Sequence, residues 1–339
     1  MDNQNQKTGR VTTEYKGAYK VKNDDGEFLA KVTGKHMFSA SSREDFPAVG
    51  DFVVIDELPE AQAVIREILP RKTIIKRKAV GGSDVQIIAT NIDVAFVVES
   101  VSRDWSLNRF ERYFSIARDG GIEPAIIINK IDLISKDELD KKLAEIKNRF
   151  PDTDVFAVSV ASGEGLDELI EYIKKDKTYC FLGSSGVGKS SLINKLIGND
   201  LIKTEDISSY SDRGKHITTA RQMYFLKNGG IVIDNPGMRE VGMANVAQGI
   251  NDLFAQITEL AQMCKYKDCT HTHESGCAVL MAVESGEVDR EKYLNYLDLK
   301  KETEFYEMSE LERREKDRDF GKFIKNTKKS LKQYGHKNF

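Results

Sequence analysis

The sequence has no hydrophobic run long enough to span a membrane. Its longest apolar stretches, such as residues 94–98 and 125–128, have the length of single strands, whereas a membrane-spanning helix needs about 20 apolar residues. Residues 1–10 are polar and contain no apolar segment of a secretory signal. We therefore expect a cytoplasmic protein without a membrane partner.

An excess of charge of one sign is also lacking. The chain carries 51 Lys and Arg against 54 Asp and Glu, which gives a net charge of −3. Binding of nucleic acid through overall positive charge is thereby excluded, so any such contact must come from local basic patches. With 339 residues, the chain is long enough for two or three domains with their own cores.

Cysteine is scarce, because the chain has only four, too few for a disulfide scaffold at this length. Three of them lie close together, in a segment that also contains histidine. Three thiolates and an imidazole form the ligand set of a closed tetrahedral zinc site. We predict one structural Zn²⁺, bound by Cys264, Cys269, His271 and Cys277. His273 is an alternative to His271, and Cys180 is expected to be a buried apolar residue in a strand.

The chain consists of three regions that differ in their sequence pattern. Residues 1–78 contain short β-branched runs separated by turns, which is typical of a small β-barrel of the oligonucleotide-binding type (OB-fold). Residues 79–244 alternate apolar strand-like runs with helical patterns, which predicts an α/β domain with a parallel sheet. Residues 245–339 lack strand patterns and predict an α-helical zinc-binding domain with a basic tail. The sequence thus predicts a multidomain protein.

A glycine-rich loop in the central region matches the phosphate-binding pattern G-x-x-x-x-G-K-[ST]. It follows a predicted strand and opens a predicted helix, which is the context that this loop needs. Its glycines let backbone N–H groups approach phosphate oxygens, and the helix N-terminus adds a positive dipole. Lys189 is expected to reach the β and γ phosphates, and Ser190 to bind Mg²⁺. The predicted loop comprises Gly183, Ser184, Ser185, Gly186, Val187, Gly188, Lys189, Ser190 and Ser191.

A second motif selects the base. Asn129, Lys130, Ile131 and Asp132 follow a predicted strand and match the N-K-x-D element of GTPases. The Asp132 carboxylate can accept from guanine N1–H and its exocyclic amine, whereas adenine offers no such pair of donors. Asn129 is expected to meet the other guanine edge and to connect loops, and the Lys130 stem to cover the base. Ser159 resembles the serine of the S-A element, whose backbone contacts guanine O6.

The base motif precedes the phosphate loop, although GTPases usually have the opposite order. Ligand loops in a doubly wound sheet all lie at the carboxyl ends of strands. The site therefore depends on which strands are neighbours and not on their order along the chain. The sequence predicts a circularly permuted P-loop GTPase domain that binds GTP or GDP with Mg²⁺.

Two further segments are predicted to respond to the γ-phosphate. Asp234 and Gly237 begin and end a D-x-x-G motif after an apolar strand. Asp234 is expected to hold a water bound to Mg²⁺, and the Gly237 N–H to contact the γ-phosphate. Between this motif and the phosphate loop, a threonine is expected to complete the Mg²⁺ shell. Thr219 is favoured for that role, and Thr218 is the alternative.

The position after Gly237 lacks the water-orienting glutamine of many GTPases. Met238 stands there, and a thioether cannot orient water. We therefore expect slow intrinsic hydrolysis, with the missing group supplied by a partner or by His216. An ordinary histidine of a surface loop is the alternative reading of His216.

Basic side chains gather in two places. Arg71, Lys72 and Lys76 belong to a cluster that ends at residue 78, and residues 320–339 carry six lysines and no acidic residue. Aromatic residues are interleaved with the lysines of the tail. In combination with the barrel, this pattern favours contact with RNA backbone and bases. A solvated tail is the alternative.

Barrel, permuted GTPase and Cys-Cys-His-Cys zinc motif, in this order, resemble the ribosome small-subunit-dependent GTPase A family of bacteria over nearly the whole chain. The resemblance implies a monomeric GTPase that docks in its GTP form on the small ribosomal subunit late in assembly. It also implies contact with rRNA through barrel and zinc module, hydrolysis stimulated by the subunit, and release in the GDP form. Asn235 and Ile217 depart from the family, which has Thr or Ser and often a threonine there.

Two other functions are compatible with the same motifs. GTP can be an affinity ligand, with negligible turnover, of an RNA-binding assembly module, and Met238 is the feature that favours this alternative. The chain can also be a permuted GTPase that acts on another ribosomal particle. The N-terminal barrel argues against that second alternative.

Overall fold

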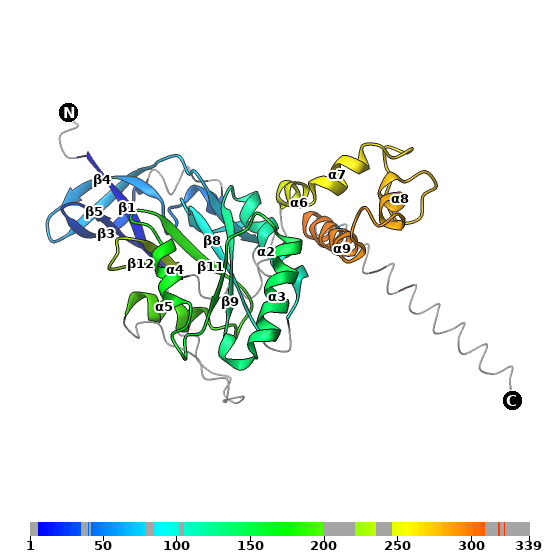
Figure 1. Ribbon diagram of the computed structural model, residues 1–339. Helices are drawn as coiled ribbons and strands as arrows, with labels where there is room; N and C mark the ends of the chain where they lie inside the picture. The colour runs from blue at the N-terminus through cyan, green and yellow to red at the C-terminus, as the bar shows by residue number, and fades with distance from the viewer. Residues whose placement is uncertain are drawn as a thin grey trace, which may run out of the picture.

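The computed structural model describes residues 6–34, 40, 42–78, 85–101, 105–198, 221–234, 246–308, 318 and 322. Figure 1 shows a barrel at the N-terminal end and a group of helices toward the C-terminal end, on opposite sides of a central α/β layer. Among the described residues, no helix is long and apolar enough to cross a membrane.

The N-terminal region is a closed barrel whose strands neighbour one another in the order β1-β2-β3-β5-β4, with β4 pairing back onto β1. All of these pairs are antiparallel except β3 with β5. Val11, Val21 and Ile55 are fully buried in its core, because alternate side chains of a strand point inward. The strands are β1 (Gln6–Tyr15), β2 (Ala18–Asn23), β3 (Gly26–Val32), β4 (Phe52–Leu58) and β5 (Gln62–Ile68), with a short 3-10 turn η1 (Arg43–Asp45) before β4.

A separate hairpin follows the barrel. Its strands β6 (Ile74–Lys78) and β7 (Val85–Thr90) pair with each other in an antiparallel two-stranded sheet and not with a barrel strand. Ile75 and Ile88 pack into the core of the central domain. Residues 74–78, which the sequence suggested as the end of the barrel region, therefore pack with the α/β domain.

The central sheet has the strand order β10-β9-β8-β11-β13-β12. Its strands are parallel except β12, which runs antiparallel to β13. The inner strands are buried and largely apolar, because both faces of the sheet are covered. The strands are β8 (Val94–Ser100), β9 (Glu123–Asn129), β10 (Val155–Val158), β11 (Thr178–Leu182), β12 (Gln222–Phe225) and β13 (Ile231–Asp234).

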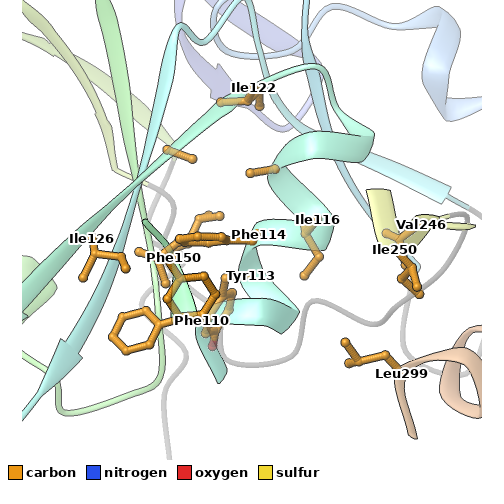
Figure 2. Packing of buried hydrophobic residues seen from close by; sticks show 14 of the residues in the cluster. Phe110, Tyr113, Phe114, Ile116, Ile122, Ile126, Phe150, Val246, Ile250 and Leu299 are labelled. Atoms are coloured by element: carbon orange, nitrogen blue, oxygen red, sulfur yellow. The ribbon is translucent and has the colours of Figure 1, made fainter. Parts of the chain in front are cut away.

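Helices cover the two faces of this sheet with separate cores. α2 (Leu107–Asp119) and α3 (Lys136–Arg149) share one core, whereas α4 (Leu166–Tyr172) and α5 (Lys189–Ile197) share the other. Figure 2 shows Phe110 and Phe114 of α2 next to Phe150, with Ile116 on the side of α2 toward Ile250. The Phe114 and Phe150 ring centroids are 5.0 Å apart. α2 therefore packs on the sheet with one side and on the C-terminal helices with the other.

The C-terminal module consists of α6 (Ala247–Leu253), α7 (Ala255–Ala261), α8 (Ala278–Glu284) and α9 (Arg290–Glu307). Gly249 brings α6 close to α2, because a Cβ at this position would lie 2.0 Å from the carbonyl oxygen of Ser115. The fold class predicted from the sequence, with a barrel, a permuted α/β domain and a helical C-terminal module, is confirmed.

Candidate nucleotide and zinc sites

The phosphate loop runs from β11 to the first turn of α5. Gly183 and Gly188 have φ values of +143° and +96°, which glycine adopts without steric cost. A Cβ on Gly188 would lie 2.3 Å from Nδ2 of Asn129, and one on Gly183 would lie 2.2 Å from the carbonyl oxygen of Val98. Both glycines thus allow the loop to pack closely against neighbouring strand ends.

Lys189 begins α5, and its Nζ donates to the carbonyl oxygens of Gly183 at 2.7 Å and Ser184 at 2.6 Å. These bonds hold the ammonium against the loop backbone. A phosphate bound by this loop would need a cation at that place. Ser190 follows in the same helical turn and is half-buried. The predicted phosphate ligands therefore lie together at one helix N-terminus.

The base motif bonds directly to the phosphate loop, although it precedes that loop in the chain. Nδ2 of Asn129 donates to the carbonyl oxygen of Val187 at 2.8 Å, and Nζ of Lys130 donates to that of Gly186 at 2.7 Å. Asn129 is 1% exposed at the end of β9, and Lys130 has a left-handed φ of +64°. The permuted chain order thus produces one continuous site, as predicted from the parallel sheet.

Ser159 contacts the base motif through its side chain. Its Oγ donates to Oδ1 of Asp132 at 2.5 Å and accepts from the Ser162 backbone N–H at 3.0 Å. Ser159 is fully buried, whereas Asp132 is exposed in the short 3-10 turn η2 (Ile131–Leu133). The hydroxyl therefore fixes the orientation of the carboxylate, a role that the sequence reading, which considered only the backbone of Ser159, missed.

Asp234 ends β13, beside the phosphate-loop strand β11. Burial raises the pKa of its carboxyl to about 6, and the charge of Lys189 opposes that rise. The proximity of Lys189 connects D-x-x-G with the phosphate loop. The other switch predictions, namely His216, Thr218, Thr219, Gly237 and Met238, fall outside the described residues.

The four predicted zinc ligands converge between α7 and α8. Their donor atoms, from Cys264, Cys269, His271 and Cys277, all lie within 4.8 Å of one another. The Sγ atoms of Cys264 and Cys277 are 3.8 Å apart, the edge of a tetrahedron with Zn–S bonds of about 2.3 Å. His271 faces these sulfurs with Nδ1, at 3.6 and 3.5 Å. The residues present therefore fit a tetrahedral Zn²⁺.

The loop around His271 favours that histidine over His273 as the fourth ligand. The His273 Nδ1 lies 2.8 Å from the Thr272 hydroxyl, whereas the Tyr293 hydroxyl donates to the His271 carbonyl oxygen at 2.5 Å. The Glu274 carboxylate accepts from the backbone N–H groups of Thr270, Thr272 and His273. The Thr270 hydroxyl also donates to this carboxylate and, together with the Thr270 N–H, lowers the pKa of Glu274. These bonds shape the loop between the second and fourth ligands.

One residue of the predicted basic cluster, Arg71, is largely buried and forms an ion pair inside the protein. Arg71 forms a two-pronged ion pair with Asp51, whose carboxylate is fully buried and also accepts from the Thr90 hydroxyl. The side chain of Arg71 is only 13% exposed. Arg71 therefore joins barrel and α/β domain and is not available for RNA. Of residues 320–339, only Lys322 is described.

A buried carboxylate joins the central domain to the C-terminal module. Glu111 of α2 is 0% exposed and receives two hydrogen bonds from Arg149 at the end of α3 and one from Asn295 of α9. Arg149 also pairs with Asp289 at 2.7 Å. No sequence pattern predicts this network, because its members are far apart in the chain and match no motif.

Comparison with known proteins agrees with the geometry. A family described as RsgA GTPase matches residues 68–244. The protein named small ribosomal subunit biogenesis GTPase RsgA 2 from Lactiplantibacillus plantarum is 41% identical over 332 residues, which cover 97% of this chain and 92% of that protein. The chain is thus similar to this relative over nearly its full length.

Solved structures show the same architecture. YjeQ from Thermotoga maritima matches with a TM-score of 0.64 and 27% identity, over 87% of this chain and 97% of YjeQ. YloQ, described as a circularly permuted GTPase, matches with a TM-score of 0.62 and 24% identity, over 91% of this chain and 99% of YloQ. The permuted strand order is therefore a known fold.

Proposed function

The chain belongs to the RsgA GTPase family, and we propose that it hydrolyses GTP in the biogenesis of the small ribosomal subunit. The proposal that the chain binds and hydrolyses GTP is supported above all by the hydrogen bonds between the base motif and the phosphate loop. Asn129 and Lys130 each donate to a carbonyl oxygen of that loop. The partner part is supported by the name of the relative from Lactiplantibacillus plantarum.

Each residue of the nucleotide site has a proposed role. Asp132 reads guanine with its carboxylate, supported by the Ser159 hydroxyl, and Lys189 binds the β and γ phosphates. Ser190 and Thr219 ligate Mg²⁺, which neutralises phosphate charge when bound, and Asp234 holds a water of that ion. Gly237 contacts the γ-phosphate, and His216 takes part in hydrolysis. The remaining residues of the phosphate loop supply backbone N–H groups.

The C-terminal module is proposed to bind one structural Zn²⁺ with three thiolates and Nδ1 of His271. The ion would supply folding free energy to the loop that carries its ligands. Barrel and zinc module are proposed to contact rRNA. The second domain boundary is proposed near residue 244, and the first lies before β6 (Ile74–Lys78), which packs with the α/β domain. We propose that the protein acts as a cytoplasmic monomer.

Release of phosphate by the full-length, zinc-loaded protein tests this function. We expect slow hydrolysis alone and an increase of at least about tenfold with small ribosomal subunits, since a partner must supply the group that Met238 cannot. Large subunits at the same concentration are the control. Stimulation by large subunits alone would favour another ribosomal particle, and no stimulation of a GTP-binding protein would favour GTP as an affinity ligand.

A further inference from the structure

The barrel and the GTPase sheet share one hydrogen-bonded ladder. β1 pairs with β4 and β2 inside the barrel and also with β12 of the central sheet. In the register of this ladder, Thr13 lies opposite Gln222, and Gln222 lies opposite Asp234. One row of residues therefore leads from a barrel strand to the carboxylate of the D-x-x-G motif.

An ion pair stabilises the short contact between β1 and β12, where, among the described residues, only Thr13 and Gln222 are paired in register. The Arg221 guanidinium donates to Oε2 of Glu14 at 3.0 Å and to the carbonyl oxygen of Ile87 at 3.1 Å. The Glu14 backbone N–H donates to the Arg221 carbonyl oxygen at 3.4 Å. The side chain of Arg221 is 13% exposed and that of Glu14 is 31% exposed. In the sequence, Arg221 follows Thr219 by two positions.

A cavity of about 270 Å³ opens beside this ion pair, between the β1–β2 turn, η1 and β7. Glu14 forms part of its wall, and Tyr15, Lys16, Arg43 and Phe46 also line it. Tyr15 is 42% exposed, and both cations are exposed. Exposed aromatic rings next to Lys and Arg bind unstacked bases and their phosphates. The volume lies just below the range of about 300–1,000 Å³ for drug-sized ligands, which suits one base.

We propose that this cavity binds one unpaired nucleotide of an RNA strand, and that the ion pair between its wall residue Glu14 and Arg221 transmits the binding to the strands that hold Asp234. The base stacks on Tyr15, and Lys16 and Arg43 meet the phosphates. Glu14 is then a positioning residue, which acts on hydrolysis through β12. The inference rests on the proposed function, because the RNA is that of the docked ribosomal particle.

Two variants of the full-length protein separate binding from transmission. The binding probe is a short single-stranded oligoribonucleotide with one 2-aminopurine, whose fluorescence falls when the base stacks. Tyr15→Ala is expected to weaken binding about tenfold or more and to remove the stimulation by small subunits. Glu14→Gln is expected to keep the fluorescence change but to lower the stimulation about tenfold.

Three comparisons make the test decisive. Lys7→Gln removes an exposed ion-pairing residue of the same strand, which contacts Asp25 and Glu57 away from the cavity, and should behave like wild type. An oligoribonucleotide with an abasic site in place of 2-aminopurine, measured by its competition with the fluorescent probe, should bind as weakly to wild type as the intact probe binds to Tyr15→Ala. If Glu14 acts through Arg221, Glu14→Gln combined with Arg221→Gln should be no worse than either change alone.

Three different results would overturn the nucleotide site, the transmission through the ion pair and the proposed function. Equal binding of the probe by wild type and Tyr15→Ala would overturn the cavity as a nucleotide site. Full stimulation of Glu14→Gln would overturn transmission through the ion pair. If wild type binds the probe but no small subunit stimulates it, the proposed function fails, while nucleotide binding in the cavity stands.

Discussion

A single hydroxyl orients the carboxylate that is proposed to recognise guanine. Oγ of Ser159 donates to Asp132 at 2.5 Å, and a hydrogen bond to a charged group contributes about 1.5–3 kcal/mol. We expect Ser159→Ala to weaken GTP binding about tenfold, measured by titration with a fluorescent GTP analogue. Ser162→Ala changes an exposed hydroxyl of the same loop that does not touch Asp132 and should leave affinity unchanged. Equal affinities of both variants would contradict this role.

Asp234 makes the stability of the metal-free protein depend on pH. Burial raises its pKa from 3.8 to about 6, so the folded chain binds this proton more tightly than the unfolded chain. Stability is therefore lost as pH rises from about 4 to about 6, by up to about 3 kcal/mol. In chelator, Asp234→Asn should be more stable than wild type at about pH 8, with a smaller difference at about pH 5. Urea unfolding measures both, and a pH-independent difference would argue against the raised pKa.

Helices α2, α3 and α9 meet at one buried charge. Arg149→Ala would leave the carboxylate of Glu111, which is 0% exposed, without its cation, and removing one partner of a buried pair costs about 3–5 kcal/mol. We expect a loss of this size in urea unfolding at constant zinc and nucleotide. Arg66→Ala, which breaks an exposed ion pair with Asp56, should cost less than about 1 kcal/mol. Similar losses for the two variants would show that Glu111 is not effectively buried.

Single strands and helices that have a local sequence pattern are predicted correctly from the sequence. Apolar runs such as 125–128 predict buried parallel strands, and the strand–glycine loop–helix order predicts α5 at the phosphate loop. Pairing between distant segments has no local signature. β6 therefore seemed to end the barrel, whereas it pairs with β7, and Arg71 seemed available for RNA, whereas it pairs with buried Asp51.

The whole molecule contains one module whose fold is expected to depend on a metal. Removing zinc by chelation, or by Cys269→Ser, should unfold the loop from Cys264 to Cys277 and loosen α7 and α8, because their packing surrounds the ligands. Amide hydrogen exchange should rise there, while GTP affinity changes by less than about twofold. Cys180→Ala changes the cysteine of β11, which is not a ligand, and should retain one zinc per chain. Unchanged exchange after loss of zinc would contradict a structural role.

The contact of β1 with β12 has a consequence for solubility. A GTPase sheet without the barrel would end at β12, with unpaired N–H and C=O groups open to other chains. Phe225 of that strand is 44% exposed, and both Phe225 and its neighbour Tyr224 favour strand pairing. The barrel strand β1 covers this edge and is therefore expected to prevent self-association through β12. A truncated chain that begins after Ile68 should aggregate with a concentration dependence that the intact chain does not show.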